Sequence, residues 1–236
     1  MSFSPTKCHT LSIALKLNPS QFAYHLCDTR LEGVKFYKYL GVFITTSLNW
    51  SMQCEEVKKK ANRILCVLQR NLSSCDQSIK TRAYTRLVRP IVEYASTAWS
   101  PHTLKDITSI ESIQRRAARF VFNDYSRSSS VSSMLDKLNW PLLKERRIGN
   151  DLTMFYKINH ALVNIPLPSE ITPRIPDIRQ SNDLNFMHLS SSVNAYKYSF
   201  YPRTIPEWNR LPLSVVPRFA LATPVLLLIV IRAVFN

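Results

Sequence analysis

The chain has 236 residues, and its 31 lysines and arginines against 16 aspartates and glutamates give a formal net charge of +15. This length suits one or two globular domains, and 45% hydrophobic with 20% charged residues excludes wholesale disorder. The three glycines, Gly33, Gly41 and Gly149, cannot build a glycine-rich phosphate loop. The composition therefore argues against a nucleotide-fuelled or NAD-dependent enzyme, and the charge indicates a polyanionic partner, either nucleic acid or an anionic membrane surface.

The positive charge is spread along the chain, with about +3 over residues 1–50, about +7 over 51–127 and about +5 over 128–236. This distribution excludes a single basic tail. The five cysteines form no Cys-x-x-Cys pair and the five histidines are scattered, so no zinc signature is present. Dispersed cysteines without a recognisable signal peptide predict an intracellular protein that is not secreted, in either the nucleus or the cytoplasm.

Residues 1–49 are predicted to form strands. Apolar residues alternate with smaller or polar ones over residues 11–17, which is typical of a half-buried strand. Turn residues follow at 18–20, and a second alternation over 22–26 predicts a hairpin partner. With a third extended run over 36–45, these strands predict a small antiparallel sheet.

From residue 50 the apolar period changes to three and four residues, which predicts a helical domain over residues 50–127. The first helix has its apolar stripe at Val57, Ala61, Ile64, Leu65, Leu68 and Leu72. The second is expected to bury Ile79, Ala83, Leu87 and Ile91, and a third, from about residue 103 to 121, to bury Ile107, Ile110, Ala117 and Val121. Pro90 is expected to kink or split the second helix.

The rest of the chain divides into four predicted segments. Residues 128–164 contain a short helix over 131–138 and a longer one after Pro141, whose inward residues are Leu152, Phe155, Ile158 and Leu162. Residues 165–192 form a proline-rich extended linker, and residues 193–216 a strand over 196–200 and a helical or turn segment over 205–211. Residues 217–236 form an apolar tail. The predicted fold class is α+β and mostly α: a small antiparallel sheet, a helical bundle and an irregular C-terminal region.

No catalytic centre is recognisable. The adjacent carboxylates Glu55 and Glu56 precede Lys59 and Lys60 by four residues, so we interpret them as a salt-bridged surface turn. Two-metal catalysis needs clustered carboxylates, and no Asp-Asp or Asp-x-Asp occurs in the sequence. No Gly-x-Ser-x-Gly or other local nucleophile signature occurs either. We predict neither a catalytic nor a metal site.

Basic residues at helical spacing are the positive signal, because arginine forks suit bidentate phosphate contacts. These residues are Lys59, Arg63 and Arg70 on the first helix, Arg82, Arg86 and Arg89 on the second, and Arg115, Arg116 and Arg119 on the third. The pattern fits a solvated basic face and a nucleic-acid groove equally well. Tyr84, Tyr94, Trp99 and Trp140 can stack on bases, although aromatic residues at such spacing are more often part of a core.

Several ordered motifs resemble one known family. They are Tyr37–Val42, Val57–Arg63, Leu87–Ala95, Trp99–Pro101, Ile113–Phe120 and Phe200–Pro212. Together they resemble the C-terminal part of reverse transcriptases from LINE-type, jockey-like non-LTR retrotransposons. The resemblance extends to about residue 216.

This resemblance implies positions for several residues. Tyr39, Leu40 and Gly41 resemble the primer-grip turn at the end of the polymerase palm, and Lys7 takes the place of a palm lysine thought to assist departure of pyrophosphate. Ser4 stands where the family would have Asn. Residues from about 50 to 121 match the helical thumb that grips the template–primer duplex, and the following residues match the region after the thumb.

The family consists of RNA-directed DNA polymerases that use Mg²⁺ bound by palm aspartates, which have no counterpart here. The resemblance therefore implies a non-catalytic fragment without a cofactor, whose partners are RNA or an RNA–DNA duplex and the remaining polymerase portion. The candidate nucleic-acid-binding residues are Lys7, Tyr39, Leu40, Gly41, Lys59, Arg63, Arg70, Arg82, Arg86, Arg89, Arg115, Arg116 and Arg119.

Two alternatives stay open. One is a degenerate mobile-element product without a stable fold, because strands separated from their palm would expose an unpaired edge. The other is a membrane-associated basic protein, because residues 219–231 are almost entirely apolar. That run is shorter than the roughly 20 residues of a spanning helix and contains Pro224, so a membrane partner is the less favoured expectation.

Overall fold

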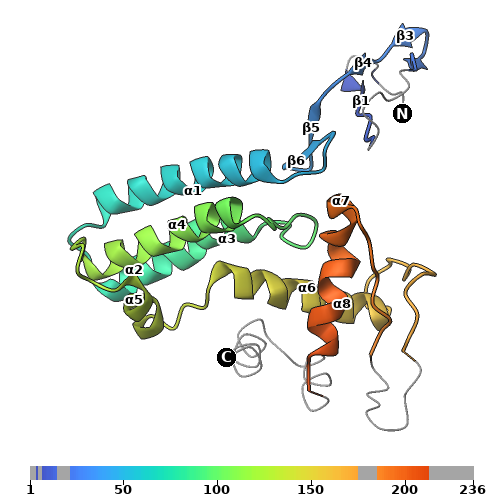
Figure 1. The fold of residues 1–236 in the computed structure, drawn as a ribbon. Helices are drawn as coiled ribbons and strands as arrows, with labels where there is room; N and C mark the ends of the chain where they lie inside the picture. The colour runs from blue at the N-terminus through green and yellow to red at the C-terminus, as the bar shows by residue number, and fades with distance from the viewer. Residues whose placement is uncertain (1–3, 5–6, 15–21, 175–184, 213–236) are drawn as a thin grey trace.

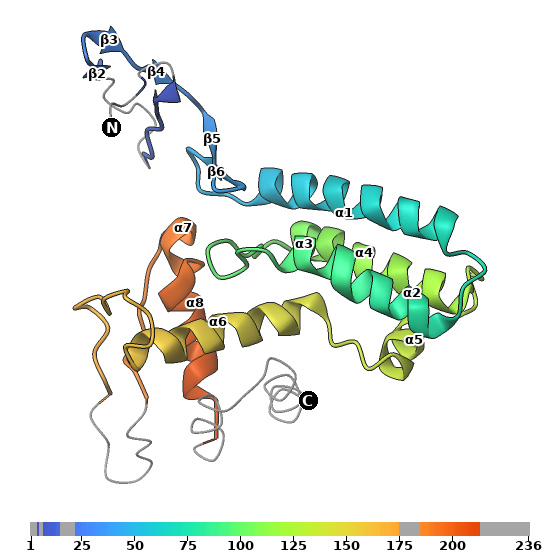
Figure 2. The ribbon, with the colours of Figure 1, turned by 180° about the vertical axis from the view of Figure 1, so that it is seen from behind.

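Short strands followed by helices make up the part of the chain that the computed structural model describes, namely residue 4 and residues 7–14, 22–174 and 185–212 (Figure 1). This arrangement confirms the prediction of a mostly helical α+β fold. The N-terminal strands extend away from the helices when the molecule is seen from the front and from behind (Figure 2).

The strands form three separate two-stranded sheets. Their bounds are β1 (His9–Thr10), β2 (His25–Leu26), β3 (Thr29–Arg30), β4 (Glu32–Gly33), β5 (Phe36–Tyr39) and β6 (Val42–Thr45). The β1–β4 pair is parallel, whereas β2–β3 and β5–β6 are antiparallel. The prediction of an entirely antiparallel sheet was therefore wrong for the first pair.

The predicted hairpin between residues 11–17 and 22–26 is not found. Residues 11–14 are not in a strand, residues 15–21 lie outside the described part, and β2 pairs with β3 instead. None of the described residues before Val42 is buried. An alternating pattern fixes strand register only where one face packs on a core, and these residues have no such face.

The predicted extended run over residues 36–45 is the β5–β6 hairpin, in which Tyr39 pairs with Val42. The two residues between them have positive φ angles, 46° at Leu40 and 84° at Gly41. Positive φ at both central positions defines a type I′ turn, whose twist matches that of the strands.

A bundle of helices follows the hairpin. It begins with α1 (Ser51–Asn71) and ends with α4 (Leu104–Phe122). Between them α2 (Gln77–Ala83), the π-helical η2 (Tyr84–Val88) and α3 (Arg89–Glu93) form one continuous helical stretch, which we call the second helix. Each of the three contacts the other two. Hydrogen bonds from Ser51 to Asp106 (2.8 Å) and from Arg116 to Asn62 (2.7 Å) show that α1 and α4 run parallel.

The predicted inward faces of α1 and α4 are confirmed. On α1, Val57, Ala61, Leu65 and Leu68 are buried, while Ile64 and Leu72 are partly buried. On α4, Ile110, Ala117 and Val121 are buried and Ile107 is half-buried. The Thr103 hydroxyl caps α4 by accepting a hydrogen bond from the Asp106 N–H (3.2 Å).

The predicted inward face of the second helix was wrong by one residue. The buried residues are Lys80, Tyr84, Val88 and Val92. Of the predicted set, Ala83 and Ile91 are partly buried against the core, whereas Ile79 and Leu87 are 45% and 53% exposed. Lys80 enters the core with its ammonium over the ring of Phe120 (5.3 Å to the centroid). Pro90 does not split the helix, which continues through the π-helical turn to Glu93.

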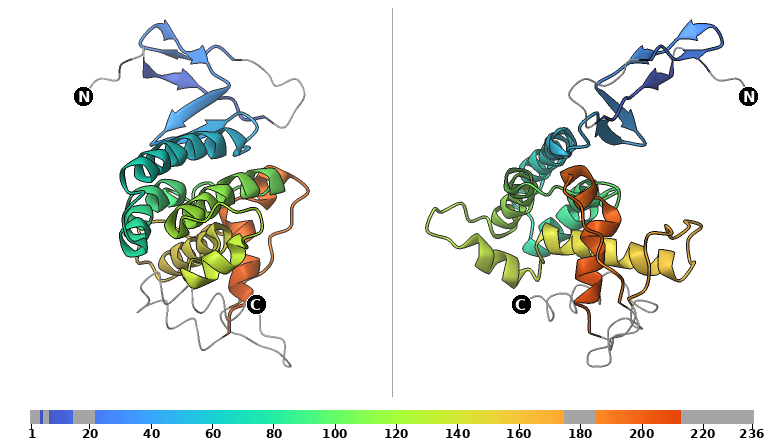
Figure 3. Two further views of the ribbon diagram at one scale, coloured as in Figure 1. Left: turned by 90° about the vertical axis from the view of Figure 1, so that its left-hand side faces the viewer. Right: turned by 45° about the vertical axis from the view of Figure 1, so that its right-hand side comes forward.

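Four helices complete the described chain: α5 (Val131–Lys137), α6 (Leu143–Asn159), α7 (Asn194–Lys197) and α8 (Phe200–Asn209). Views from the side show α8 crossing α6 (Figure 3). Both helices contribute to a second hydrophobic core, which contains Leu152, Phe155, Tyr156, Ile171, Phe186, Ile205, Trp208 and Leu211.

Three expectations for this region need correction. Leu162 lies beyond α6 and is 63% exposed. The described parts of the expected linker pack onto the second core through Ile171 and Phe186, and residues 175–184 lie outside the described part. The strand expected over residues 196–200 is instead the end of α7 and the start of α8, where Tyr198 stacks on His102 and Phe200 packs against the second core. The prediction of a helical or turn segment over residues 205–211, which contains Trp208, is confirmed by α8.

No helix among the described residues is long and apolar enough to cross a membrane. The apolar run over residues 219–231 lies outside the described part.

Candidate nucleic-acid interface

The turn between β5 and β6 is fixed to the end of the second helix. The Tyr94 hydroxyl donates a hydrogen bond to the Leu40 carbonyl (2.9 Å), and a Cβ at Gly41 would lie 3.4 Å from the Tyr94 ring. The Phe43 N–H donates to the Gln53 side-chain oxygen (2.9 Å), which fastens β6 to α1. The turn is thereby held in place while its Tyr39 and Leu40 side chains remain 60% and 74% exposed.

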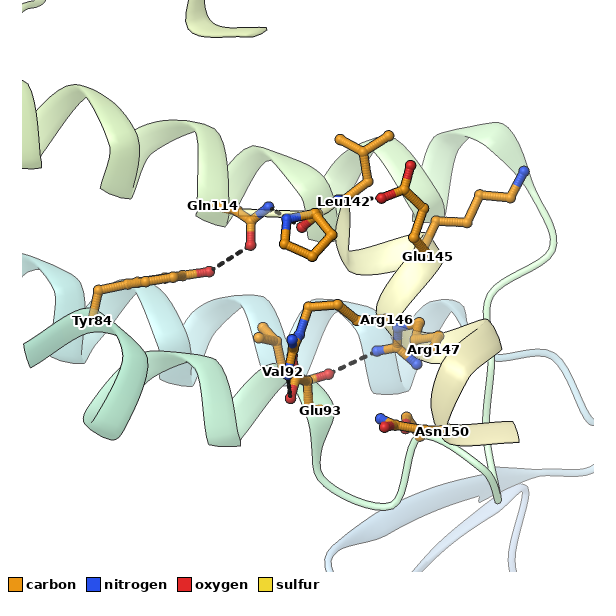
Figure 4. A network of polar contacts seen from close by, with 12 residues as sticks. Tyr84, Val92, Glu93, Gln114, Leu142, Glu145, Arg146, Arg147 and Asn150 are labelled. Atoms are coloured by element: carbon orange, nitrogen blue, oxygen red, sulfur yellow. Dashed lines mark hydrogen bonds and ion pairs between the residues drawn. The ribbon is translucent and has the colours of Figure 1, made fainter. Parts of the chain in front are cut away.

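The loop that carries Tyr94, residues 94–103, is itself tied to α6. Arg147 donates to the carbonyls of Val92 (2.8 Å) and Trp99 (3.2 Å), and its guanidinium stacks on the Trp99 ring at 4.1 Å. Asn150 donates to the Ser96 hydroxyl (3.0 Å). Figure 4 shows these α6 side chains directed at the end of the second helix. Burial lowers the pKa of the Arg147 guanidinium to about 10.

Helix α8 contacts the same loop through Arg203. Arg203 donates to the Thr97 carbonyl (2.8 Å) and forms a two-point ion pair with Asp151 of α6 (2.9 and 3.1 Å). Burial raises the pKa of Asp151, although Arg203 opposes the shift. The region after the bundle therefore supports the loop that positions the hairpin turn.

A second polar network joins the bundle helices. Gln114 of α4 accepts a hydrogen bond from the Tyr84 hydroxyl (3.1 Å) and donates to the Pro141 carbonyl (2.8 Å). Arg146 forms an ion pair with Glu93 at the end of the second helix. These contacts, also drawn in Figure 4, fix α4 and the start of α6 against the second helix.

Arg147, Asp151 and Arg203 were not predicted as functional residues. The signal that could have found the first two is positional, because Leu143, Arg147, Asp151 and Phe155 recur every four residues and all are buried. Charged residues on a buried helical stripe indicate a hydrogen-bonded internal network. No comparable signal marks Arg203.

The outer face of α1 carries three of the predicted basic residues, Lys59, Arg63 and Arg70, all exposed. Lys59 forms an ion pair with Glu56 (2.8 Å), which confirms the interpretation of this turn as a surface salt bridge, at a spacing of three residues. Arg63 and Arg70 form no hydrogen bond or ion pair with another described residue. Arg116 of α4 lies at the edge of this face, where it donates a hydrogen bond to Asn62 of α1. We call these four residues the α1 basic face.

The other predicted arginines divide into free and internally bonded residues. Arg82, Arg86 and Arg115 are exposed, and none bonds to another residue of the described chain. Arg119 instead donates to the Ser126 carbonyl (2.8 Å), which ties down the following loop. Arg89 is half-buried over Tyr84 and Trp140 (5.5 and 5.7 Å to the centroids), and burial lowers the pKa of its guanidinium.

These basic residues do not converge on one groove. Because α1, the second helix and α4 each contact the other two, their outer faces point in three different directions. Tyr84, Trp99 and Trp140 are buried in the core, and Tyr94 is engaged at the hairpin turn. The α1 basic face is therefore the candidate interface.

Lys7 is exposed, but several of its neighbours lie outside the described part of the chain. Among the described residues, no group of three or more His, Cys, Asp or Glu side chains could hold a metal ion.

Comparison of the chain with known protein families, curated proteins and solved structures finds no match.

Proposed function

We propose that this chain is a non-catalytic part of an RNA-directed DNA polymerase of the non-LTR retrotransposon type, which grips an RNA–DNA duplex through its phosphates. The observation that carries the proposal is the α1 basic face. Lys59 and Arg70 are eleven residues apart, so the row extends about 16 Å along the helix axis. Duplex nucleic acid carries about one negative charge per 1.7 Å of axis, so this length of duplex offers several phosphates to the four cations.

The hairpin turn supports the same proposal. Tyr39 and Leu40 project from a turn held by Tyr94, and only β6 and a short loop separate that turn from α1 along the chain. In the resembling family, such a turn contacts the primer strand next to the helical thumb. A rigid turn beside a basic helix suits a protein that holds a strand end in one position.

Equilibrium binding to an RNA–DNA duplex tests the proposal. The triple variant Lys59→Ala, Arg63→Ala, Arg70→Ala should bind at least about tenfold more weakly than the wild type at low salt, because three phosphate contacts are lost. The matched control replaces three exposed basic residues away from this face, Lys137, Lys157 and Arg174, by Ala. Equal binding by the two triple variants would refute an interface on α1.

Arg115, Arg116 and Arg119 are a poorer choice for this test. Arg116 and Arg119 hold other parts of the chain through hydrogen bonds, so replacing them changes structure as well as charge.

The degenerate-product alternative predicts no cooperative thermal transition in the purified chain. The membrane alternative predicts flotation with anionic vesicles, whereas our proposal predicts neither flotation nor loss of cooperativity.

A further inference from the structure

The second helix has two largely apolar stripes, and only one of them is fully buried. The buried stripe is Lys80, Tyr84, Val88 and Val92. The other stripe, one residue earlier at each step, is Ile79, Ala83, Leu87 and Ile91. Ile79 and Leu87 are 45% and 53% exposed, while Ala83 and Ile91 are partly buried at the core's edge. We call these four residues the outer stripe.

The surroundings of the outer stripe are basic. Arg82 and Arg86 are exposed on the same helix, and no Asp or Glu occurs between residues 77 and 92. The exposed aliphatic residues of the outer stripe thus lie on the same helix as two arginines that bond to no other described residue.

We propose that the outer stripe binds an amphipathic helix of a protein partner, with aliphatic residues on one side of that helix and Asp or Glu beside them. The four-residue spacing is the spacing at which side chains of one helix interleave with those of another. Acidic side chains on the partner would pair with Arg82 and Arg86. This face thus differs from the α1 basic face in the chemistry of its ligand.

Nucleic acid does not fit this face. Isoleucine and leucine neither stack on bases like aromatic rings nor bond to phosphates, so a duplex on Arg82 and Arg86 would leave the aliphatic residues without a partner. The stripe from residue 79 to residue 91 is about 18 Å long. A partner helix of about twelve residues is long enough to cover it.

A labelled helical peptide of about 18 residues tests the proposal by fluorescence anisotropy with the full chain. The probe carries leucines at three- and four-residue steps and glutamates beside them. One control peptide has the same composition in scrambled order, and the other has lysines in place of glutamates. We expect binding of the first peptide alone, and at least about tenfold weaker binding after the double substitution Ile79→Ser, Leu87→Ser.

Two further variants test the role of charge and the specificity for the outer stripe. Arg82→Glu with Arg86→Glu, which alters only exposed charges, should abolish binding of the acidic peptide and permit binding of the lysine peptide. Leu104→Ser, at a leucine that is 82% exposed on α4, should leave binding unchanged. Thermal melting checks that each variant is folded.

Three results would overturn the inference. They are no binding of the acidic peptide to the wild type, equal binding of the scrambled peptide, and unchanged binding by the Ile79→Ser, Leu87→Ser variant. A loss of RNA–DNA duplex binding in that variant would assign the face to nucleic acid instead. Because the test does not depend on the α1 basic face, its outcome is independent of the proposed function.

Discussion

Replacement of Arg147 by Met should destabilise the protein by about 3 kcal/mol. The side chain is only 5% exposed, and it donates to two carbonyls at the end of the second helix and in the following loop. Hydrogen bonds from a charged group contribute about 1.5–3 kcal/mol each, and a stacked guanidinium adds up to about 2 kcal/mol.

The burial of the charge opposes these contributions. Burial lowers the pKa of Arg147 to about 10, which corresponds to a cost of roughly 3 kcal/mol for keeping the buried group charged. Methionine avoids that cost but leaves two buried carbonyls without a donor. The two hydrogen bonds and the stacking together contribute about 6 kcal/mol, and subtracting the cost of about 3 kcal/mol gives the expected loss of about 3 kcal/mol.

Urea unfolding followed by tryptophan fluorescence measures this loss. The denaturant midpoint should fall while the slope m stays constant, because the surface exposed on unfolding does not change. Arg127→Met, at an exposed loop residue, serves as the control and should leave the midpoint unchanged. A loss below about 1 kcal/mol for Arg147→Met would refute the idea that this guanidinium holds the loop.

Three further predictions concern other parts of the chain. Gly41→Ala should destabilise the turn by about 1 kcal/mol, because φ is 84° at this position, whereas Leu40→Asn should stabilise the turn slightly. The urea midpoints of the two variants should therefore shift in opposite directions, and equal shifts would contradict the assignment of a type I′ turn. Burial raises the pKa of Glu111 above its ordinary 4.5, so the folded state retains a proton that the unfolded state releases, and stability falls as pH rises through the folded pKa. Glu111→Gln should therefore lose less stability than the wild type between about pH 4.5 and neutral pH in the same unfolding assay, and identical pH profiles would contradict this. Cys66 is exposed, whereas Cys54 is buried and burial raises its pKa to about 12. A thiol reagent should therefore label Cys66 in the folded protein but Cys54 only after unfolding, and peptide mass spectrometry would identify the labelled residue.

The apolar pattern predicted the helices that have one clear stripe. On α1 and α4 the apolar residues lie on a single face and the basic residues opposite, so the pattern fixes both the helix and its orientation. The second helix has two apolar stripes one residue apart, and the sequence favoured the more aliphatic one. The structure buries the other, because the Tyr84 hydroxyl bonds to Gln114 and the Lys80 ammonium lies over Phe120.

The N-terminal strands and the internal network were harder to predict for different reasons. Strand register before Val42 depends on a buried face that the described residues lack. The contacts of Arg147 and Arg203 with the loop join residues 48 and 106 positions apart, and local periodicity carries no information about such distances. Exposure of Lys59, Arg63 and Arg70 was predicted. The bond of Arg116 depends on Asn62 of another helix, the bond of Arg119 on the loop after α4, and the burial of Arg89 on the ring of Trp140.

The salt dependence of RNA–DNA duplex binding tests the central claim most directly. Four phosphate contacts by the α1 basic face predict a slope of about −3.6 for the logarithm of the binding constant against the logarithm of the salt concentration. The triple variant at Lys59, Arg63 and Arg70 should reduce the slope to about −0.9, while the control triple variant at Lys137, Lys157 and Arg174 should retain the wild-type slope. The same slope in the wild type and both variants would contradict a duplex-binding face on α1.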